Sequence, residues 1–354
     1  MNSLDPKSLM RTALRGFGAS LPYTLLTYLV PRDVIVLMYH AVGEIPAPHL
    51  RHLYAYKTPA QFEEDLIHLK REFVLPTWAE FVASGNRSRR IKRPRVLITF
   101  DDGLSDCFRV VRPLLLKHRI PCMFFVTKAW VDNRIMFFRH KASLCIEGFG
   151  KLSSSDRNRF VRLAAADGLK CPSEQSGFAS WMLGLDDKHG PTIDRVCHLL
   201  GIDVDDILKT KQPYLTSDEI KQLHADGFTI GGHSVSHPRL QTLSGEEIEL
   251  EIIESCRFVR DLLKIKEVTF AFPFSADGVS RPNLRLLHQR HPWISAMFGS
   301  NGVDLDEPFL FNRINADEPP AGVARSNALH LIKTSYANAL LRSARQASAS
   351  RIGI

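Results

Sequence analysis

Two adjacent carboxylates stand where an apolar run of the sequence ends. Asp101 and Asp102 follow residues 96–100, which predict a buried strand, and Gly103 comes next. Ionised carboxylates in apolar surroundings must be paired or must hold a metal. Side chains alternate across a strand, so the two aspartates begin on opposite faces unless the chain turns, and glycine allows that turn. The pattern suits one metal ligand and one base, although a plain strand-to-turn Asp-Asp-Gly explains these residues alone equally well.

Two histidines lie four residues apart, far downstream of the aspartates. His233 and His237 follow residues 228–232, which predict a short strand with a glycine break. Residues with this spacing share a face of a helical turn, and a tight loop brings them together equally well. With one carboxylate they form a His-His-Asp set that suits zinc and leaves positions open for water and substrate. A lone pair of this kind is more often structural, so the prediction depends on both motifs.

In this order, the motifs resemble those of the polysaccharide deacetylases, the NodB-homology group also called carbohydrate esterase family 4. Residues 99–103 resemble the first motif of the family, residues 233–237 the second and residues 270–274 the third. Residues 36–42 resemble the strand ending in Tyr-His that opens the branch acting on extracellular polysaccharides. The resemblance covers residues 34–133 and 214–315.

The resemblance also implies roles for single residues. Asp101 would be the catalytic base, and Asp102, His233 and His237 would hold a divalent metal, with zinc the first expectation. The backbone N–H of Phe274 would stabilise the oxyanion, because the family uses this donor from a residue that is more commonly tyrosine.

The sequence departs from the family at the groups that assist the base and the leaving group. Ala271 stands near the place where many relatives have an arginine that orients the base, and Arg313 is a candidate replacement. The C-terminal Leu-x-His motif is not convincing, because the segment around His330 predicts a helix. His40 ends a strand that reaches the same rim. It is therefore the candidate general acid or substrate contact, with a structural histidine as the alternative.

These motifs predict a metal-dependent hydrolase that removes N-acetyl groups from an N-acetylated sugar in a glycan, glycolipid or sugar precursor. One alternative is a hydrolase of another small amide or ester on the same scaffold. A second is a catalytically degenerate barrel that only binds glycan, which the missing arginine and C-terminal histidine suggest. A binding module has no need for a base beside a complete set of metal ligands, and this argues against the second alternative.

Strands and helices alternate along the chain in the order that builds a parallel sheet. Strands are predicted at residues 34–39, 96–100, 121–126 and 267–272, and capping boxes that begin helices are predicted at Thr58, Thr216 and Ser244. The alternation indicates an α/β fold, a distorted or incomplete (β/α) barrel whose strand ends carry the site.

A helical segment interrupts this alternation. Residues 134–213 show helical periodicity at 157–166 and 192–200. We therefore expect an N-terminal helical extension at 1–33, a deacetylase barrel at 34–133 and 214–340, and a helical insertion at 134–213. The insertion is either a cap that restricts access to the rim or plain scaffold. Phe178 and Trp181 are the candidate sugar contacts of such a cap, and the small core of a scaffold insertion is the alternative.

Composition and charge restrict the partners of the chain. The 354 residues are 44% hydrophobic and 24% charged, which is ordinary for a globular protein. The net charge of +8 is partly concentrated in a basic run at residues 87–95. We interpret this run as a solvated connecting loop, with binding to anionic lipid as the less favoured alternative. No aromatic residues interleave with the run, so no nucleic-acid partner is expected.

Cysteines and the N-terminus indicate the compartment. The six cysteines are scattered without a CxxC motif, which favours a reducing compartment. The apolar stretch at residues 17–30 is interrupted by Pro22 and is shorter than the ~20 residues that span a bilayer. We expect a cytoplasmic protein whose N-terminal helix either packs on the barrel or touches a membrane surface, with the basic loop as the other candidate for peripheral membrane contact.

Overall fold

The computed structural model describes residue 30 and residues 34–85, 93–317 and 327–352, with side chains up to residue 342 in the last segment. The N-terminal extension predicted at residues 1–33 falls almost wholly outside the described residues, as do four members of the basic run, Arg87, Arg89, Arg90 and Lys92. Of the other two members, Arg93 donates hydrogen bonds to main-chain carbonyls at the end of a helix, and Arg95 lies in a strand.

Eight parallel strands form a nearly closed barrel with one unsealed seam. In order around the barrel they are β7 (Leu310–Asn312), β6 (Ile294–Gly299), β5 (Val268–Ala271), β4 (Thr229–Gly232), β3 (Met123–Val126), β2 (Arg95–Phe100), β1 (Val34–Tyr39) and β8 (Ile314–Asn315). The predicted distorted or incomplete (β/α) barrel is therefore confirmed.

The seam lies between β7 and β8, which are consecutive in the sequence. β7 pairs with β6 and β8 pairs with β1, so the chain crosses the seam from one edge of the sheet to the other. Arg313 is the single residue between the two strands. Its side chain is fully buried, which places a cation at the seam of the barrel.

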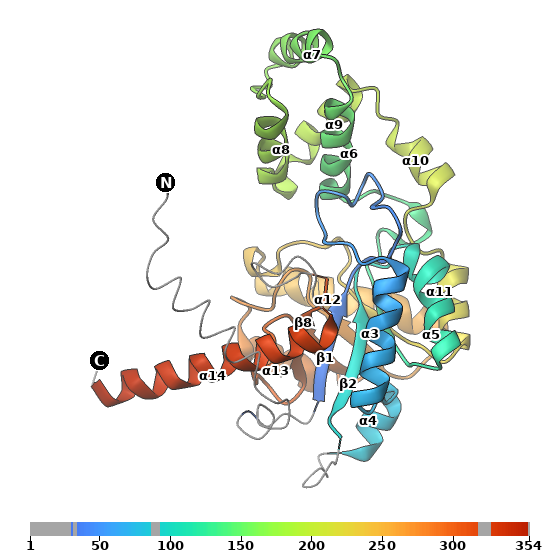
Figure 1. The fold of residues 1–354 in the computed structure, drawn as a ribbon, viewed down its shortest axis with the longest axis vertical. Helices are drawn as coiled ribbons and strands as arrows, with labels where there is room; N and C mark the ends of the chain where they lie inside the picture. Colours follow the sequence, from blue (N-terminus) through green and yellow to red (C-terminus); the bar gives the residue numbers. More distant parts are fainter. Residues whose placement is uncertain (1–29, 31–33, 86–92, 318–326, 353–354) are drawn as a thin grey trace.

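Helices cover the outside of the barrel (Figure 1). They are α3 (Pro59–Glu72), α5 (Arg112–His118), α11 (Ser217–Ala225), α12 (Gly245–Leu263), α13 (Arg281–Arg290) and α14 (Ala328–Ile352). A π-helical turn, Cys107–Val111, leads into α5. The three predicted capping boxes are present, with Thr58, Thr216 and Ser244 as the first members. Each box satisfies two N–H groups that would otherwise lack partners at the start of its helix.

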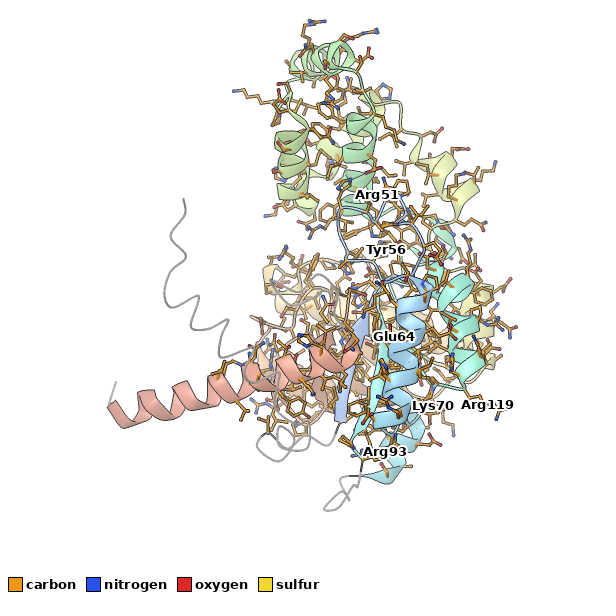
Figure 2. All side chains as sticks on the ribbon, in the orientation of Figure 1. Arg51, Tyr56, Glu64, Lys70, Arg93 and Arg119 are labelled. Atoms are coloured by element: carbon orange, nitrogen blue, oxygen red, sulfur yellow. The ribbon has the colours of Figure 1, made fainter. Side chains whose placement is uncertain are left out.

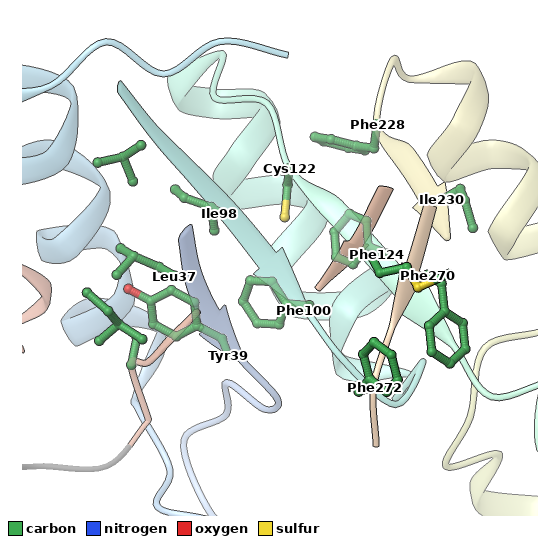
Figure 3. Close-up of a cluster of buried hydrophobic side chains, with 14 of the residues drawn as sticks. Leu37, Tyr39, Ile98, Phe100, Cys122, Phe124, Phe228, Ile230, Phe270 and Phe272 are labelled. Atoms are coloured by element: carbon green, nitrogen blue, oxygen red, sulfur yellow. The ribbon is translucent and has the colours of Figure 1, made fainter. Parts of the chain in front are cut away.

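Alternate side chains of the strands build two separate cores. The outer core lies between strands and helices, and Figure 3 shows part of it, including Leu37, Tyr39, Ile98, Phe100 and Phe124. The inner core fills the barrel with Val36, Leu97, Met123, Phe125, Ala271, Ala296 and Phe298. Helix α4 (Trp78–Ser84) packs Trp78 and Phe81 against this inner core. The same alternation places Thr99 and Asp101 on the inner side of β2, in line with Leu97.

Of the α-helices between β3 and β4, the five that precede α11 stand off one end of the barrel (Figure 1). They are α6 (Phe138–Gly150), α7 (Ser154–Ala166), α8 (Gln175–Gly184), α9 (Gly190–Leu199) and α10 (Val204–Lys211). In Figure 2, Arg51 and Tyr56 mark the loop from β1 to α3, which lies between these helices and the barrel. None of the helices in the described ranges is long and apolar enough to cross a bilayer.

The helices of this segment have a core of their own. Phe178 is fully buried and stacks on Phe149, with ring centroids 4.0 Å apart and an interplanar angle of 8°. Trp181 packs against the same cluster. Phe178 therefore belongs to the small core of the helical segment, the interpretation that the sequence slightly favoured over a sugar contact. Amphipathic helices that leave the barrel must bury their apolar faces against one another.

Candidate metal and catalytic site

Three buried side chains meet at the rim of the barrel. One ligand atom from each of Asp102, His233 and His237 lies within 4.8 Å of the other two. Asp102 Oδ1 is 3.4 Å from His233 Nε2 and 3.3 Å from His237 Nε2. The structure thus brings together the three residues predicted as metal ligands, from segments more than a hundred residues apart in the chain.

A tight turn after β2 directs the two aspartates apart. Asp102 has a φ of 74° and Gly103 a φ of 71°, so the chain leaves the extended conformation immediately after Asp101. A Cβ on Gly103 would lie 3.1 Å from Val126 Cγ1, so the turn requires glycine here both for its φ and for space. The turn expected from Gly103 is present, and it begins one residue earlier. The positive φ at Asp102 is the kind of backbone strain that clusters at functional sites.

Hydrogen bonds fix the loop that holds the two histidines. His233 Nδ1 lies 2.9 Å from the carbonyl oxygen of Ala271, so Nδ1–H donates there and Nε2 is presented to Asp102. The backbone N–H of His237 donates to the Ser234 hydroxyl at 2.9 Å. Glu251 of α12 accepts hydrogen bonds from the amides of residues 235 and 236. These contacts orient the imidazole of His233 and fix the backbone of the loop that carries His237.

The chemistry of the three residues fits a divalent cation. Asp102 Oδ1 is buried, has no hydrogen-bond partner and faces both imidazoles, whereas Oδ2 accepts a hydrogen bond of 2.7 Å from the Tyr54 hydroxyl. Burial opposes ionisation of Asp102, but His233 and His237 hold the pKa of this carboxyl well below its usual range. An ionised oxygen buried without a partner costs free energy, and a cation would remove that cost. Two nitrogen donors and one oxygen donor form a set that suits zinc.

The second aspartate is held by an arginine. Arg313 Nη1 donates to Asp101 Oδ1 at 2.6 Å and Nη2 donates to Oδ2 at 2.8 Å. Burial acts to raise the pKa of Asp101, but the charge of Arg313 and then that of His233 outweigh burial and lower it. His233 Nε2 lies 3.8 Å from Asp101 Oδ2, so this carboxylate borders the three candidate ligands. Arg313 is therefore the arginine partner of Asp101, as the sequence suggested in view of the alanine at position 271.

His40 is paired with a carboxylate that the sequence did not indicate. Its Nδ1 lies 2.6 Å from Asp317 Oδ2, and its backbone N–H donates to the same oxygen at 3.0 Å. Burial acts to lower the pKa of His40, but Asp317 outweighs it and raises the pKa to about 9. Burial also raises the pKa of Asp317 above its usual value, against the pull of His40. We take the pair as ionised near neutral pH, because the short contact joins two buried groups that can neutralise each other.

Phe274 borders the same site. Its φ of 58° is in the left-handed region, and its ring centroid lies 4.8 Å from that of His237. In the described part of the chain, its backbone N–H donates to no acceptor, while its carbonyl accepts from the Ser300 hydroxyl at 2.9 Å. An N–H group left free beside a candidate metal site is available to a substrate oxygen.

Sequence reasoning missed four neighbours of the site. Tyr54 binds Asp102 and stacks on His40 at 4.8 Å, and Trp130 stacks on His237 at 5.1 Å. Phe137 packs its ring 4.9 Å from that of His237, and Asp317 pairs with His40. None of the four carried a local signal in the sequence, and the strand before Asp317 has only two residues. His330 lies in α14, as expected from its helical surroundings.

Comparisons with known proteins add independent findings. The family described as polysaccharide deacetylase matches residues 88–287. The fold is similar to that of the deacetylase PplD of Streptococcus pyogenes, solved with acetate, with a TM-score of 0.52 and 15% identity over 80% of this chain and 92% of that one. It is also similar to IcaB of Ammonifex degensii, with a TM-score of 0.51 and 16% identity over 86% and 97%. No curated protein sequence matches the chain.

Proposed function

The chain belongs to the polysaccharide deacetylase family and is a hydrolase of carbon–nitrogen bonds, and we propose that it removes the acetyl group from an N-acetylated sugar with the help of a divalent metal. The observation that carries this proposal is the juxtaposition of a complete His-His-Asp set with a second carboxylate, Asp101, that borders it. A set of ligands alone would support binding, but a base beside it supports hydrolysis.

Asp101 is the proposed base. Water that attacks the amide carbonyl must lose a proton, and Asp101 is ionised because its pKa is lowered. Its two hydrogen bonds from Arg313 hold the carboxylate in one orientation, which positions it for proton transfer. Burial of this pair also keeps bulk water away from the base.

His40 is the proposed acid. The nitrogen that leaves as an amine must gain a proton, and the raised pKa keeps His40 protonated at neutral pH. Asp317 holds Nδ1, so Nε2 remains as the nitrogen that gives up the proton. Tyr54 stacks on this ring and also bonds Asp102, which couples the orientation of the acid to that of a metal ligand.

The negative charge that develops on the carbonyl oxygen needs donors. The free backbone N–H of Phe274 is the proposed donor from this chain. A divalent cation, most readily zinc, held by Asp102, His233 and His237 would supply Lewis-acid polarisation of the carbonyl and of the attacking water.

The test is acetate release from a panel of N-acetylated sugars by purified protein of known metal content. We expect turnover that chelator removes and that one divalent metal per chain restores. A panel of simple N-acetyl amides and acetyl esters without a sugar serves as the control. Turnover of those compounds at the same rate as the sugars would contradict the proposal, and so would metal-loaded protein that binds sugars without releasing acetate.

We also propose that the protein works in a reducing compartment. In the described residues all six cysteines are free thiols, five of them buried, and none joins distant parts of the barrel. Buried thiols of this kind pack as small apolar groups and need no oxidation to stabilise the fold.

A further inference from the structure

Two arginines lie over one aromatic ring beside the site. The guanidinium carbon of Arg239 is 4.7 Å from the ring centroid of Phe274, and that of Arg139 is 5.9 Å from it. The two cations are therefore no further apart than the sum of these distances. Phe274 in turn contacts the ring of His237, so both arginines lie near one of the candidate metal ligands.

The two arginines come from different parts of the fold. Arg239 follows the loop of the two histidines, whereas Arg139 is the second residue of α6 in the segment between β3 and β4. This places a charge from the helical segment at the mouth of the barrel. Phe178 and Trp181, the aromatic residues proposed as sugar contacts, pack instead within the core of the helical segment.

Neither arginine has a carboxylate partner among the described residues. Two arginines nearby in the chain do have one, since Arg195 pairs with Asp167 at 2.7 Å and Arg134 with Asp132 at 3.2 Å. Arg139 is half-buried, and burial together with the charge of Arg239 lowers the pKa of its guanidinium. Two neighbouring cations without an anion repel each other, so the arrangement favours an anion that comes from outside.

The start of α6 adds to the positive potential. This helix of 13 residues begins at Phe138, and no side chain caps its first turn. The preceding residue, Phe137, packs its ring 4.9 Å from that of His237, so the start of the helix borders the site. The first N–H groups of a helix and its dipole favour a negative group, and phosphate is a frequent occupant of such positions.

We propose that Arg139, Arg239 and the first turn of α6 bind a phosphate group of the substrate. The acetylated sugar would then be one that is joined to phosphate, as in a nucleotide-linked sugar or a lipid-linked sugar. A guanidinium group can donate two parallel hydrogen bonds to the oxygens of one phosphate. Two arginines beside the start of a helix therefore match a group that carries several charged oxygens. This inference rests on the proposed function and narrows its substrate class.

The first test compares phosphate-linked with neutral substrates. UDP-N-acetylglucosamine and polyprenyl-diphosphate-N-acetylglucosamine are assayed against the neutral triacetylchitotriose, with acetate release as the readout. We expect the wild-type protein to prefer at least one phosphate-linked sugar, and the better of the two identifies the source of the phosphate. Arg139→Gln and Arg239→Gln should each lower the ratio of kcat/KM for that sugar over the neutral one by about tenfold, since hydrogen bonds to charged groups contribute this much.

The matched control is Arg195→Gln, in the same helical segment but paired with Asp167, which should leave the ratio unchanged. A second readout is calorimetric binding of inorganic diphosphate to the full chain, which both site variants should weaken. The inference is overturned if neutral and phosphate-linked sugars are hydrolysed equally well, or if neither variant changes the ratio and diphosphate does not bind. If no acetylated sugar is hydrolysed, the proposed function fails, and diphosphate binding then decides on the arginine site by itself.

Discussion

Arg313 and Asp101 form a buried bidentate ion pair across the seam of the barrel. The two residues are 212 positions apart, and their side chains are 0% and 2% exposed. Arg313 also donates to the Gly299 carbonyl and the Thr99 hydroxyl. One side chain therefore connects the unsealed edge of the barrel to the candidate base, so the closure of the fold and the chemistry of the site depend on each other.

Replacing Arg313 tests that connection. Arg313→Met leaves a buried carboxylate without its cation, which typically costs ~3–5 kcal/mol of stability. The folded-state pKa of Asp101 is lowered, so its contribution to stability is present above the unfolded-state pKa and is lost as the pH falls through the folded-state pKa. The variant should lose this contribution, and the acid limb of kcat/KM should move to higher pH. Urea unfolding and a pH–rate profile measure the two effects.

The conservative variant Arg313→Lys separates charge from geometry. It keeps a cation near Asp101 but not the two parallel hydrogen bonds. We expect a smaller shift of the acid limb than in Arg313→Met, with kcat still reduced. An acid limb that stays in place in both variants would show that Asp101 is not the titrating base.

Asp101 and Asp102 should differ in what they contribute. Asp101→Asn should lower kcat by ~10²–10⁴-fold, the usual contribution of a general base, while metal content stays near the wild-type value. Asp102→Asn should lower both metal content and turnover, because it removes the one carboxylate among the three candidate ligands. Metal analysis and acetate release on the same preparations distinguish the two. Equal metal loss in both variants would contradict this division of roles.

Tyr54 and Tyr56 provide a matched pair for the support of the metal site. The Tyr54 hydroxyl donates to Asp102 at 2.7 Å, whereas that of Tyr56 donates to Asp106 at 3.4 Å. Tyr54→Phe should weaken metal affinity by about 10–100-fold, as losses of groups that orient a ligand do. Tyr56→Phe should leave metal affinity unchanged. Competition with a metal indicator dye measures the metal affinity of both variants. Equal affinities would show that the Tyr54 hydroxyl does not support metal binding.

Asp317 should set the alkaline limb of activity. The pKa of His40 is raised to about 9, so the acid form persists through neutral pH and is lost above that value. The stability that the pair contributes is likewise complete below the ordinary histidine pKa and is lost as the pH rises through about 9. Asp317→Asn should move the alkaline limb of kcat to lower pH. His40→Asn should lower kcat at every pH, and an unchanged alkaline limb in Asp317→Asn would exclude His40 as the acid.

Much of the barrel was predictable, because local signals are strong where strands are buried and helices begin with capping boxes. Val34–Tyr39 has the predicted bounds, and Thr58, Thr216 and Ser244 cap the helices as predicted. Strands β6, β7 and β8 were not predicted, and in β7 and β8 three and two residues carry too little periodicity to distinguish a strand from a loop.

The site was predictable only where motifs placed several reactive residues close together in the sequence. Asp102 and the two histidines come from such motifs, and the structure brings them together. Tyr54 and Asp317 stand alone in the sequence, and their contacts depend on long-range folding that no local pattern encodes. Phe178 has the residue type expected of a sugar contact, but the helical segment needs it for its own core.

Cys145 and Cys197 bear on the compartment of the protein. Their sulfur atoms lie 3.4 Å apart in the core of the helical segment, one on α6 and the other on α9, and both are free thiols. A disulfide between residues 52 positions apart would stabilise the folded state by up to about 4 kcal/mol through the entropy of the unfolded chain.

A reducing compartment keeps the pair open, so protein alkylated at the moment of cell lysis should show both cysteines modified. Oxidation of the purified protein with diamide should then form the bond and raise the midpoint of urea unfolding, and Cys197→Ser should abolish that increase. A Cys145–Cys197 disulfide in the protein alkylated at lysis would contradict the proposed reducing compartment, while the barrel and its site would stand unaffected.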